Sequence, residues 1–139
     1  MNKEFIPYEQ ALSLKELGFD EPCFGWYRSS LIPSNFTEYF LETEFGMNES
    51  PSDWVNSNFL DKACSSPLYQ QAFRWFREKY GLYSYIETVF VVGAASPIKY
   101  DYVILENNEE EVFYTNMPYH SHEEAELACL KKLIKIVKQ

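Results

Sequence analysis

Apolar positions along this chain recur every three to four residues in some segments and every second residue in others, which predicts both helices and strands. Helices are expected over residues 7–19 and 66–81 and after Ser121. Strands are expected over residues 23–28, 82–92, 99–106 and 111–116. This order predicts an α+β fold, with an antiparallel sheet of about four strands packed against three main helices in a single domain over residues 1–139.

Local signals define the ends of the first helix. Pro7 suits a first helical turn, where a missing N–H costs nothing. Gly18 suits the left-handed position just past the end, and Phe19 can then fold back on Leu14. These residues predict a helix that ends in a Schellman motif.

The second helix is the most aromatic part of the chain. Ser66 is predicted to cap it, with Pro67 in its first position and Gly81 at its stop. Its five aromatic residues are Tyr69, Phe73, Trp75, Phe76 and Tyr80. A helix that is apolar on nearly every side must be covered from more than one direction. It therefore marks either the centre of the domain or a surface that another molecule covers.

The third helix has the clearest start. Ser121 and Glu124 have the spacing of a capping box. Glutamates cluster in its first turns and lysines in its last, which complements the helix dipole. Before it, Asn107-Asn108-Glu109 is predicted to be the turn of a hairpin within a three-stranded meander.

Residues 29–66 show the weakest pattern and are predicted to be irregular, as a surface excursion. Residues 35–45 fit either a short amphipathic helix or a strand, and residues 52–60 fit another short helix. No Lys or Arg occurs between residues 38 and 61. The acidic residues there are Glu38, Glu42, Glu44, Glu49, Asp53 and Asp61.

Composition narrows the function classes. A chain of 139 residues with 46% apolar and 18% aromatic residues can form one core unaided. Its net charge of −9 argues against direct binding of nucleic acid or of an anionic membrane. Residues 1–66 hold four Lys or Arg against eleven Asp or Glu, a balance that suits either solubility or a basic partner.

Three cysteines, Cys23, Cys64 and Cys129, are widely spaced and odd in number, which indicates reduced thiols rather than a disulfide framework. The sequence shows no apolar signal segment, and its longest apolar run, residues 89–95, is too short to span a bilayer. A cytoplasmic location is therefore expected.

No familiar catalytic motif is present: the sequence lacks a Walker A loop, GxGxxG, GxSxG and HExxH. His120 and His122 could contribute to a metal site, but a strand-to-helix junction capped by Ser121 explains the segment more simply. A catalytic Cys129 and paired carboxylates at residues 109–111 are weaker candidates still. We expect no metal and no cofactor, and a binding function is favoured over an enzymatic one.

The aromatic helix offers the other candidate site. Arg74 lies between aromatic residues, so a face with Tyr69, Arg74 and Trp75 could stack on bases or hold an anion. Core packing, with the long basic side chains reaching out to water, explains the same pattern. The core interpretation is the favoured one.

Three stretches resemble a group of small uncharacterised proteins encoded by phages and prophages of Bacteroidetes-type bacteria. They cover residues 5–25, 67–82 and 123–134, and include Pro67-Leu-Tyr-Gln-Gln-Ala-Phe-Arg-Trp-Phe-Arg-Glu-Lys-Tyr-Gly-Leu82. The resemblance implies a phage or mobile-element accessory protein in a bacterial cytoplasm. It carries no activity and no site residue.

Two classes of function follow. The preferred one is a non-enzymatic module that binds a host or phage protein, in its sharper form as an acidic inhibitor that imitates DNA through Glu42, Glu44, Glu49 and Asp53. The alternative is a small-molecule binder or small enzyme, with a pocket lined by Trp75, Tyr83, Tyr85 and Tyr102. Self-assembly through exposed aromatic side chains is a third interpretation.

Overall fold

The computed structural model describes residues 2–29, 38–106, 112–114 and 118–139. The chain divides into two compact units, unit 1 of residues 1–69 and unit 2 of residues 70–139. Each unit is described by itself. The α+β class is confirmed, and the organisation of the whole chain as one domain stays a prediction.

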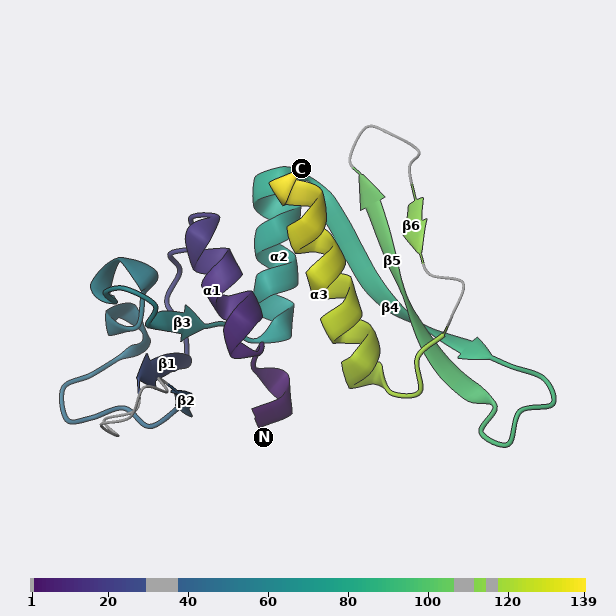
Figure 1. Cartoon of the computed structure of the whole chain (residues 1–139), viewed down its shortest axis with the longest axis horizontal. Coiled ribbons are helices and arrows are strands. Elements are labelled where there is room, and N and C mark those ends of the chain that lie inside the picture. Colours follow the sequence, from purple (N-terminus) through teal and green to yellow (C-terminus); the bar gives the residue numbers. More distant parts are fainter. Residues whose placement is uncertain (1, 30–37, 107–111, 115–117) are drawn as a thin grey trace. The chain divides into compact units, whose positions relative to one another are not determined.

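Unit 1 contains helix α1 (Tyr8–Glu16) and a small antiparallel sheet. The sheet has the order β2-β1-β3, formed by Tyr39–Glu42, Gly25–Ser29 and Cys64–Ser66. Trp26 in the central strand pairs with Glu42 on one side and with Ser65 on the other. Three single-turn 3-10 helices, η1 (Asn2–Glu4), η2 (Pro51–Asp53) and η3 (Asn56–Asn58), complete the unit (Figure 1).

Helix α1 ends in the predicted Schellman motif. The Phe19 N–H donates to the Leu14 carbonyl at 2.9 Å and the Gly18 N–H donates to the Lys15 carbonyl at 3.0 Å. Gly18 has a φ of 98°, which glycine adopts at little cost. Leu14 and Phe19 are both buried, so the chain reversal adds to the core of unit 1.

The weakly patterned segment contains regular elements. Strand β2 decides between the two interpretations of residues 35–45 in favour of a strand at residues 39–42, while residues 35–37 lie outside the described residues. The short helix expected over residues 52–60 is replaced by η2 and η3. The buried Asn56 amide joins these turns to the core, because its Nδ2 donates to the Phe19 carbonyl and its Oδ1 accepts from the Ser65 N–H, both at 2.8 Å.

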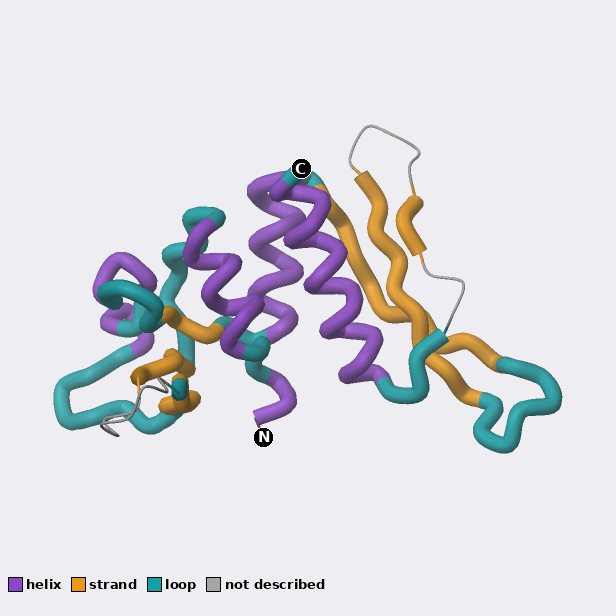
Figure 2. The backbone as a smooth tube through the Cα atoms, in the orientation of Figure 1, coloured by secondary structure: helices purple, strands orange, loops and turns teal. Residues whose placement is uncertain are grey.

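Unit 2 contains the predicted antiparallel meander. Its strands are β4 (Leu82–Phe90), β5 (Ile98–Glu106) and β6 (Val112–Tyr114), in the order β4-β5-β6. Strands β4 and β5 pair without interruption from Leu82↔Glu106 to Phe90↔Ile98 (Figure 2). The predicted turn at residues 107–109, and residues 111 and 115–116 of the expected last strand, lie outside the described residues.

Helix α3 (His122–Lys138) packs on β5 and β4. As predicted, Ser121 caps it, with its Oγ accepting from the Glu124 N–H at 3.1 Å. Buried residues of α3 and of the sheet form the core of unit 2, among them Leu82, Ile104, Cys129, Leu130 and Leu133.

Two sequence predictions need correction. The chain forms two three-stranded sheets instead of one sheet of about four strands, because β1 pairs with β2 and β3 and not with the meander. Helix α2 spans Tyr69–Tyr80, so Ser66 does not cap it and Pro67 is not in its first position. Ser66 instead ends β3, where it pairs with Gly25 and its Oγ donates to the Ile6 carbonyl at 3.1 Å. The predicted stop at Gly81 is confirmed by its φ of 67°.

Among the described residues, no helix has the length and apolar character needed to cross a bilayer.

Candidate functional site

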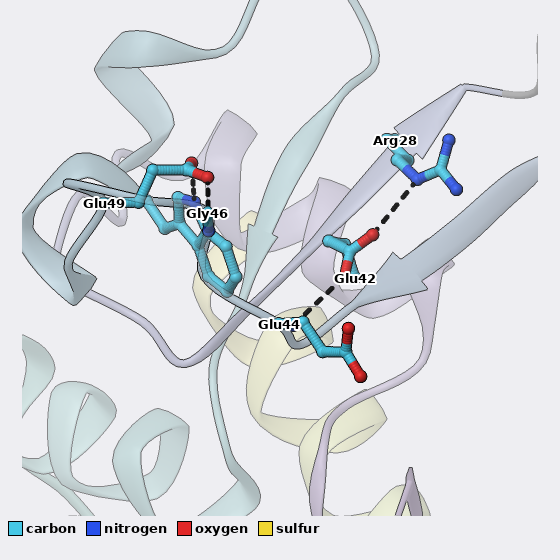
Figure 3. A network of polar contacts seen from close by, with 6 residues as sticks. Arg28, Glu42, Glu44, Gly46 and Glu49 are labelled. Carbon is cyan, nitrogen blue, oxygen red and sulfur yellow. Dashed lines mark hydrogen bonds and ion pairs between the residues drawn. The ribbon is translucent and has the colours of Figure 1, made fainter.

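The acidic segment of unit 1 is the first candidate site, and its Glu42 makes internal contacts. Glu42 lies at the end of β2, where one carboxylate oxygen accepts from the Glu44 N–H at 3.0 Å. The other oxygen lies 3.5 Å from Nε of Arg28 on the neighbouring strand β1 (Figure 3). This carboxylate therefore holds the chain as it leaves the sheet, and Arg28 partly neutralises its charge.

The Glu49 carboxylate accepts a second set of local hydrogen bonds. Its two carboxylate oxygens accept from the Gly46 N–H at 2.6 Å and from the Trp54 indole Nε1–H at 3.1 Å (Figure 3). The Trp54 ring is buried and stacks on Phe45 with the centroids 3.9 Å apart. A charge-assisted hydrogen bond thus satisfies the one polar atom of a buried indole.

Asp53 forms a capping box with Ser50 at η2. Its Oδ2 accepts from the Ser50 N–H at 2.8 Å, and the Asp53 N–H donates back to Ser50. The side chain remains exposed. Asp53 therefore combines a structural role with a charge that faces solvent.

Glu44 differs from these three carboxylates. Within the described part of the chain its carboxylate accepts no hydrogen bond, and in Figure 3 it points away from Glu42. The candidate acidic residues are thus not four equivalent charges. Glu42, Glu49 and Asp53 also hold the turns together, and Glu44 is left to interact with solvent or a partner.

Most acidic side chains of unit 1 face solvent, whereas two of its four basic side chains have interaction partners within the unit. Nine of its eleven Asp and Glu residues are exposed. Of its four Lys and Arg residues, Arg28 pairs with Glu42 and Lys15 is turned toward the backbone. Among the exposed side chains of unit 1, nine Asp or Glu residues stand against three Lys or Arg residues, so its surface is strongly acidic.

Lys15 is the residue that sequence reasoning missed. Its Nζ donates to the carbonyls of Phe59, Asp61 and Ala63 at 3.0, 3.0 and 2.7 Å, which satisfies all three ammonium donors. In the sequence, a lysine in the last turn of a helix is explained by the helix dipole alone. Nothing local indicates a partner segment more than 40 residues away.

The second candidate site was the face of α2 with Tyr69, Arg74 and Trp75. Tyr69 is 6% exposed and Trp75 7% exposed, whereas Arg74 is exposed. The Trp75 ring carries the Lys79 ammonium 4.9 Å from its centroid. The two aromatic rings are thus part of buried packing, and Arg74 is the one residue of the three at the surface.

The pocket expected between the sheet and the aromatic helix meets a geometric obstacle. Tyr102 pairs with Ile86, so it lies on the same sheet face as Ile86, whereas Tyr83 and Tyr85 alternate with Ile86 and lie on the opposite face. These three tyrosines cannot line one cavity. Two open surface pockets lie elsewhere, one of about 280 Å³ beside Lys15 and Asn56 and one of about 450 Å³ between Tyr119 and Lys131.

The two histidines have different partners. His120 Nδ1 lies 2.7 Å from Lys99 Nζ, and His122 Nδ1 lies 3.2 Å from a Glu126 oxygen. Within the described residues, no three His, Cys, Asp or Glu side chains gather as metal ligands would.

All three cysteines are buried and outside any disulfide, as reduced thiols in a core would be. Burial raises the pKa values of Cys64 and Cys129 to about 12, so both are protonated at neutral pH.

Comparison of the chain with protein-family models, with curated proteins and with solved structures finds no match.

Proposed function

We propose that this chain is a phage or mobile-element accessory protein that acts without catalysis, by binding a basic surface of a host or phage protein through unit 1. The observation that carries the proposal is the excess of exposed carboxylates in unit 1, nine against three exposed Lys and Arg side chains. Lys15 and Arg28 have internal partners, while nine carboxylates of the unit are exposed. Such a surface attracts a positively charged groove and repels nucleic acid.

The segment from Glu38 to Asp61 supports the acidic inhibitor in particular. It presents carboxylates without any Lys or Arg between them, and internal hydrogen bonds hold several of them in place. Charges that are already positioned lose little conformational freedom when a partner binds. A protein whose own ligand is a phosphate backbone offers the matching surface.

The experiment is an affinity capture from bacterial lysate with the tagged full-length chain, at low and at high salt. The test variant combines Glu38→Gln with Glu44→Gln, because both side chains are exposed and neither accepts a hydrogen bond within the described part of the chain. The control combines Glu78→Gln with Glu123→Gln, two exposed residues of unit 2 that give the same change of charge.

We expect one stoichiometric partner that high salt releases and that duplex DNA or heparin displaces. At low salt the test variant should bind it roughly two- to thirtyfold more weakly, because each exposed ion pair contributes about 0.2–1 kcal/mol. The control should bind normally. A partner that tolerates high salt, or equal weakening by both variants, would contradict binding through the acidic segment.

A further inference from the structure

Strand β4 forms one edge of the sheet in unit 2. It spans nine residues, Leu82–Phe90, and in the order β4-β5-β6 it pairs with β5 on one side only (Figure 1). Among the described residues, no backbone group pairs with its other side. A free edge of this length presents a row of unpaired backbone donors and acceptors, to which another strand can form hydrogen bonds.

The hydrogen-bond pattern identifies the backbone groups on this edge. Val91 and Pro97 continue the β4–β5 register, and the Val91 N–H donates to the Pro97 carbonyl at 2.7 Å. Because paired residues of an antiparallel ladder alternate between bonded and non-bonded positions, the odd-numbered residues of β4 point their backbone groups at β5. The N–H and C=O of Ser84, Ile86 and Thr88 therefore point outward.

This edge lacks the features that normally prevent strands from pairing. β4 contains no Pro, Lys or Arg, and its continuous register with β5 excludes a bulge. Its single charge is Glu87. An unprotected edge of nine residues indicates that a partner strand is accommodated rather than avoided.

We propose that the partner is β4 of a second copy of this chain, paired antiparallel about a two-fold axis beside Ile86. That axis places Ile86 opposite Ile86 of the second copy. The two residues form a hydrogen-bonded pair, because the outward N–H and C=O groups of each meet those of the other. All nine residues of each strand then overlap, with Ser84 opposite Thr88 of the copy. The two sheets join into one sheet of six strands.

The side chains suit this register. Tyr83 and Tyr85, which are 41% and 53% exposed, face Val89 and Glu87 of the copy, and aromatic residues opposite β-branched ones are favourable cross-strand pairs. Glu87 lies opposite Tyr85 of the second copy and not opposite Glu87 of that copy. The two Glu87 carboxylates are therefore diagonal neighbours rather than directly opposite.

Helix α3 leaves room for the pairing. A two-fold axis perpendicular to the sheet keeps both copies of α3 on the same face, and α3 packs more on β5 than on β4. The two β5 strands would be three strand spacings apart, about 14 Å, whereas a helix with its side chains is about 10–12 Å wide.

A proline substitution tests the edge. In Thr88→Pro the lost N–H points outward, so the β4–β5 bonds remain, and a proline is tolerated at an edge whose N–H faces solvent. Thr88→Ala is the control, because it keeps the N–H at the same exposed position. Sedimentation velocity over a wide concentration range should give a dimer for the natural chain and for Thr88→Ala, and a folded monomer for Thr88→Pro.

A cysteine pair tests the register. Tyr85 and Glu87 of the copy would occupy a non-bonded position, where the Cα atoms are about 4.5 Å apart and a disulfide can form. Under mild oxidation, chains with Tyr85→Cys mixed with chains with Glu87→Cys should become covalently linked in pairs. Either variant alone should not, and the three native cysteines are buried.

A natural chain that stays monomeric at high concentration overturns the proposal, as does a dimer that persists in folded Thr88→Pro. A dimer without the mixed disulfide would overturn this register. Neither outcome affects the test of the acidic segment, which measures capture of another protein.

Discussion

Glu49 shows how a residue's function in this protein depends on what its side chain contacts. In the sequence it is one of several acidic residues, but in the structure it joins the Gly46 N–H to the indole of a buried tryptophan. Glu44, five residues earlier, has the same chemistry and accepts no bond within the described part of the chain. The two residues therefore form a matched pair for mutation.

We predict that Glu49→Gln lowers the free energy of unfolding by about 1.5–3 kcal/mol, because an amide can replace only one of the two charge-assisted acceptors. Glu44→Gln should change it by less than about 0.5 kcal/mol, as exposed substitutions usually do. Urea unfolding followed by fluorescence measures both. Equal losses would show that the Glu49 contacts contribute nothing to stability.

Glu126 differs from the exposed Glu44 and Glu49, because it lies buried on α3. Burial raises its pKa above 4.5, and the neighbouring His122 offsets this in part. A carboxyl with a raised folded pKa contributes most to stability below its unfolded pKa, and that contribution is lost as pH rises through the folded pKa.

We therefore predict that Glu126→Gln gains stability relative to the natural chain as pH rises from about 4.5 toward neutrality. Denaturant unfolding at a series of pH values gives the difference at each pH. Glu124→Gln, at an exposed position of the same helix, removes the same charge and is the matched control. A difference for Glu126→Gln that does not change with pH would contradict the raised pKa.

At the scale of elements, Lys15 fastens the end of α1 to the segment that leads into β3. Three backbone carbonyls between Phe59 and Ala63 surround its ammonium group. Asp61 within this segment has a φ of 53°, which a non-glycine residue rarely adopts. The lysine thus helps to hold a turn whose own backbone conformation is unfavourable.

Replacing this lysine should loosen the segment more than the helix. We predict that Lys15→Met costs about 1.5–3 kcal/mol, the contribution of hydrogen bonds to a charged group. Hydrogen exchange should increase first at residues 59–63. Lys3→Met, at an exposed position, is the control and should leave stability nearly unchanged. Unchanged exchange in this segment would contradict the role of Lys15.

At the scale of the whole molecule, charge is the dominant feature. The net charge is −9, and unit 1 exposes nine of its eleven carboxylates. Like charges held together in a compact state repel one another, and added salt screens that repulsion. The same surface that we propose to bind a basic partner therefore destabilises the free protein.

We predict that moderate sodium chloride raises the melting temperature, with about 3–5 °C expected for each 1 kcal/mol gained by a chain of this size. The double variant Glu38→Gln with Glu44→Gln should respond less to salt. Potassium fluoride at equal ionic strength should act alike, because screening does not depend on the ion. A melting temperature that falls with salt would contradict self-repulsion.

The sequence by itself determined the features that depend on neighbouring residues. The Schellman end of α1, the stop at Gly81, the cap at Ser121 and the β4–β5–β6 meander are all confirmed. Each depends on backbone geometry or side-chain alternation over a few positions, so a local pattern is sufficient to predict it.

Only the tertiary structure decided how distant segments combine. Ser66 has the sequence context of a cap, yet it ends β3, because it pairs with Gly25 in the sheet and its Oγ donates to the Ile6 carbonyl, both far along the chain. The pairing of β1 with β2 and β3 likewise separated the strands into two sheets. For the candidate site, composition located the acidic segment, but only the fold distinguished Glu49, which holds a buried indole, from Glu44. The physical reason is the same in each case: partners far apart in sequence leave no periodic signal.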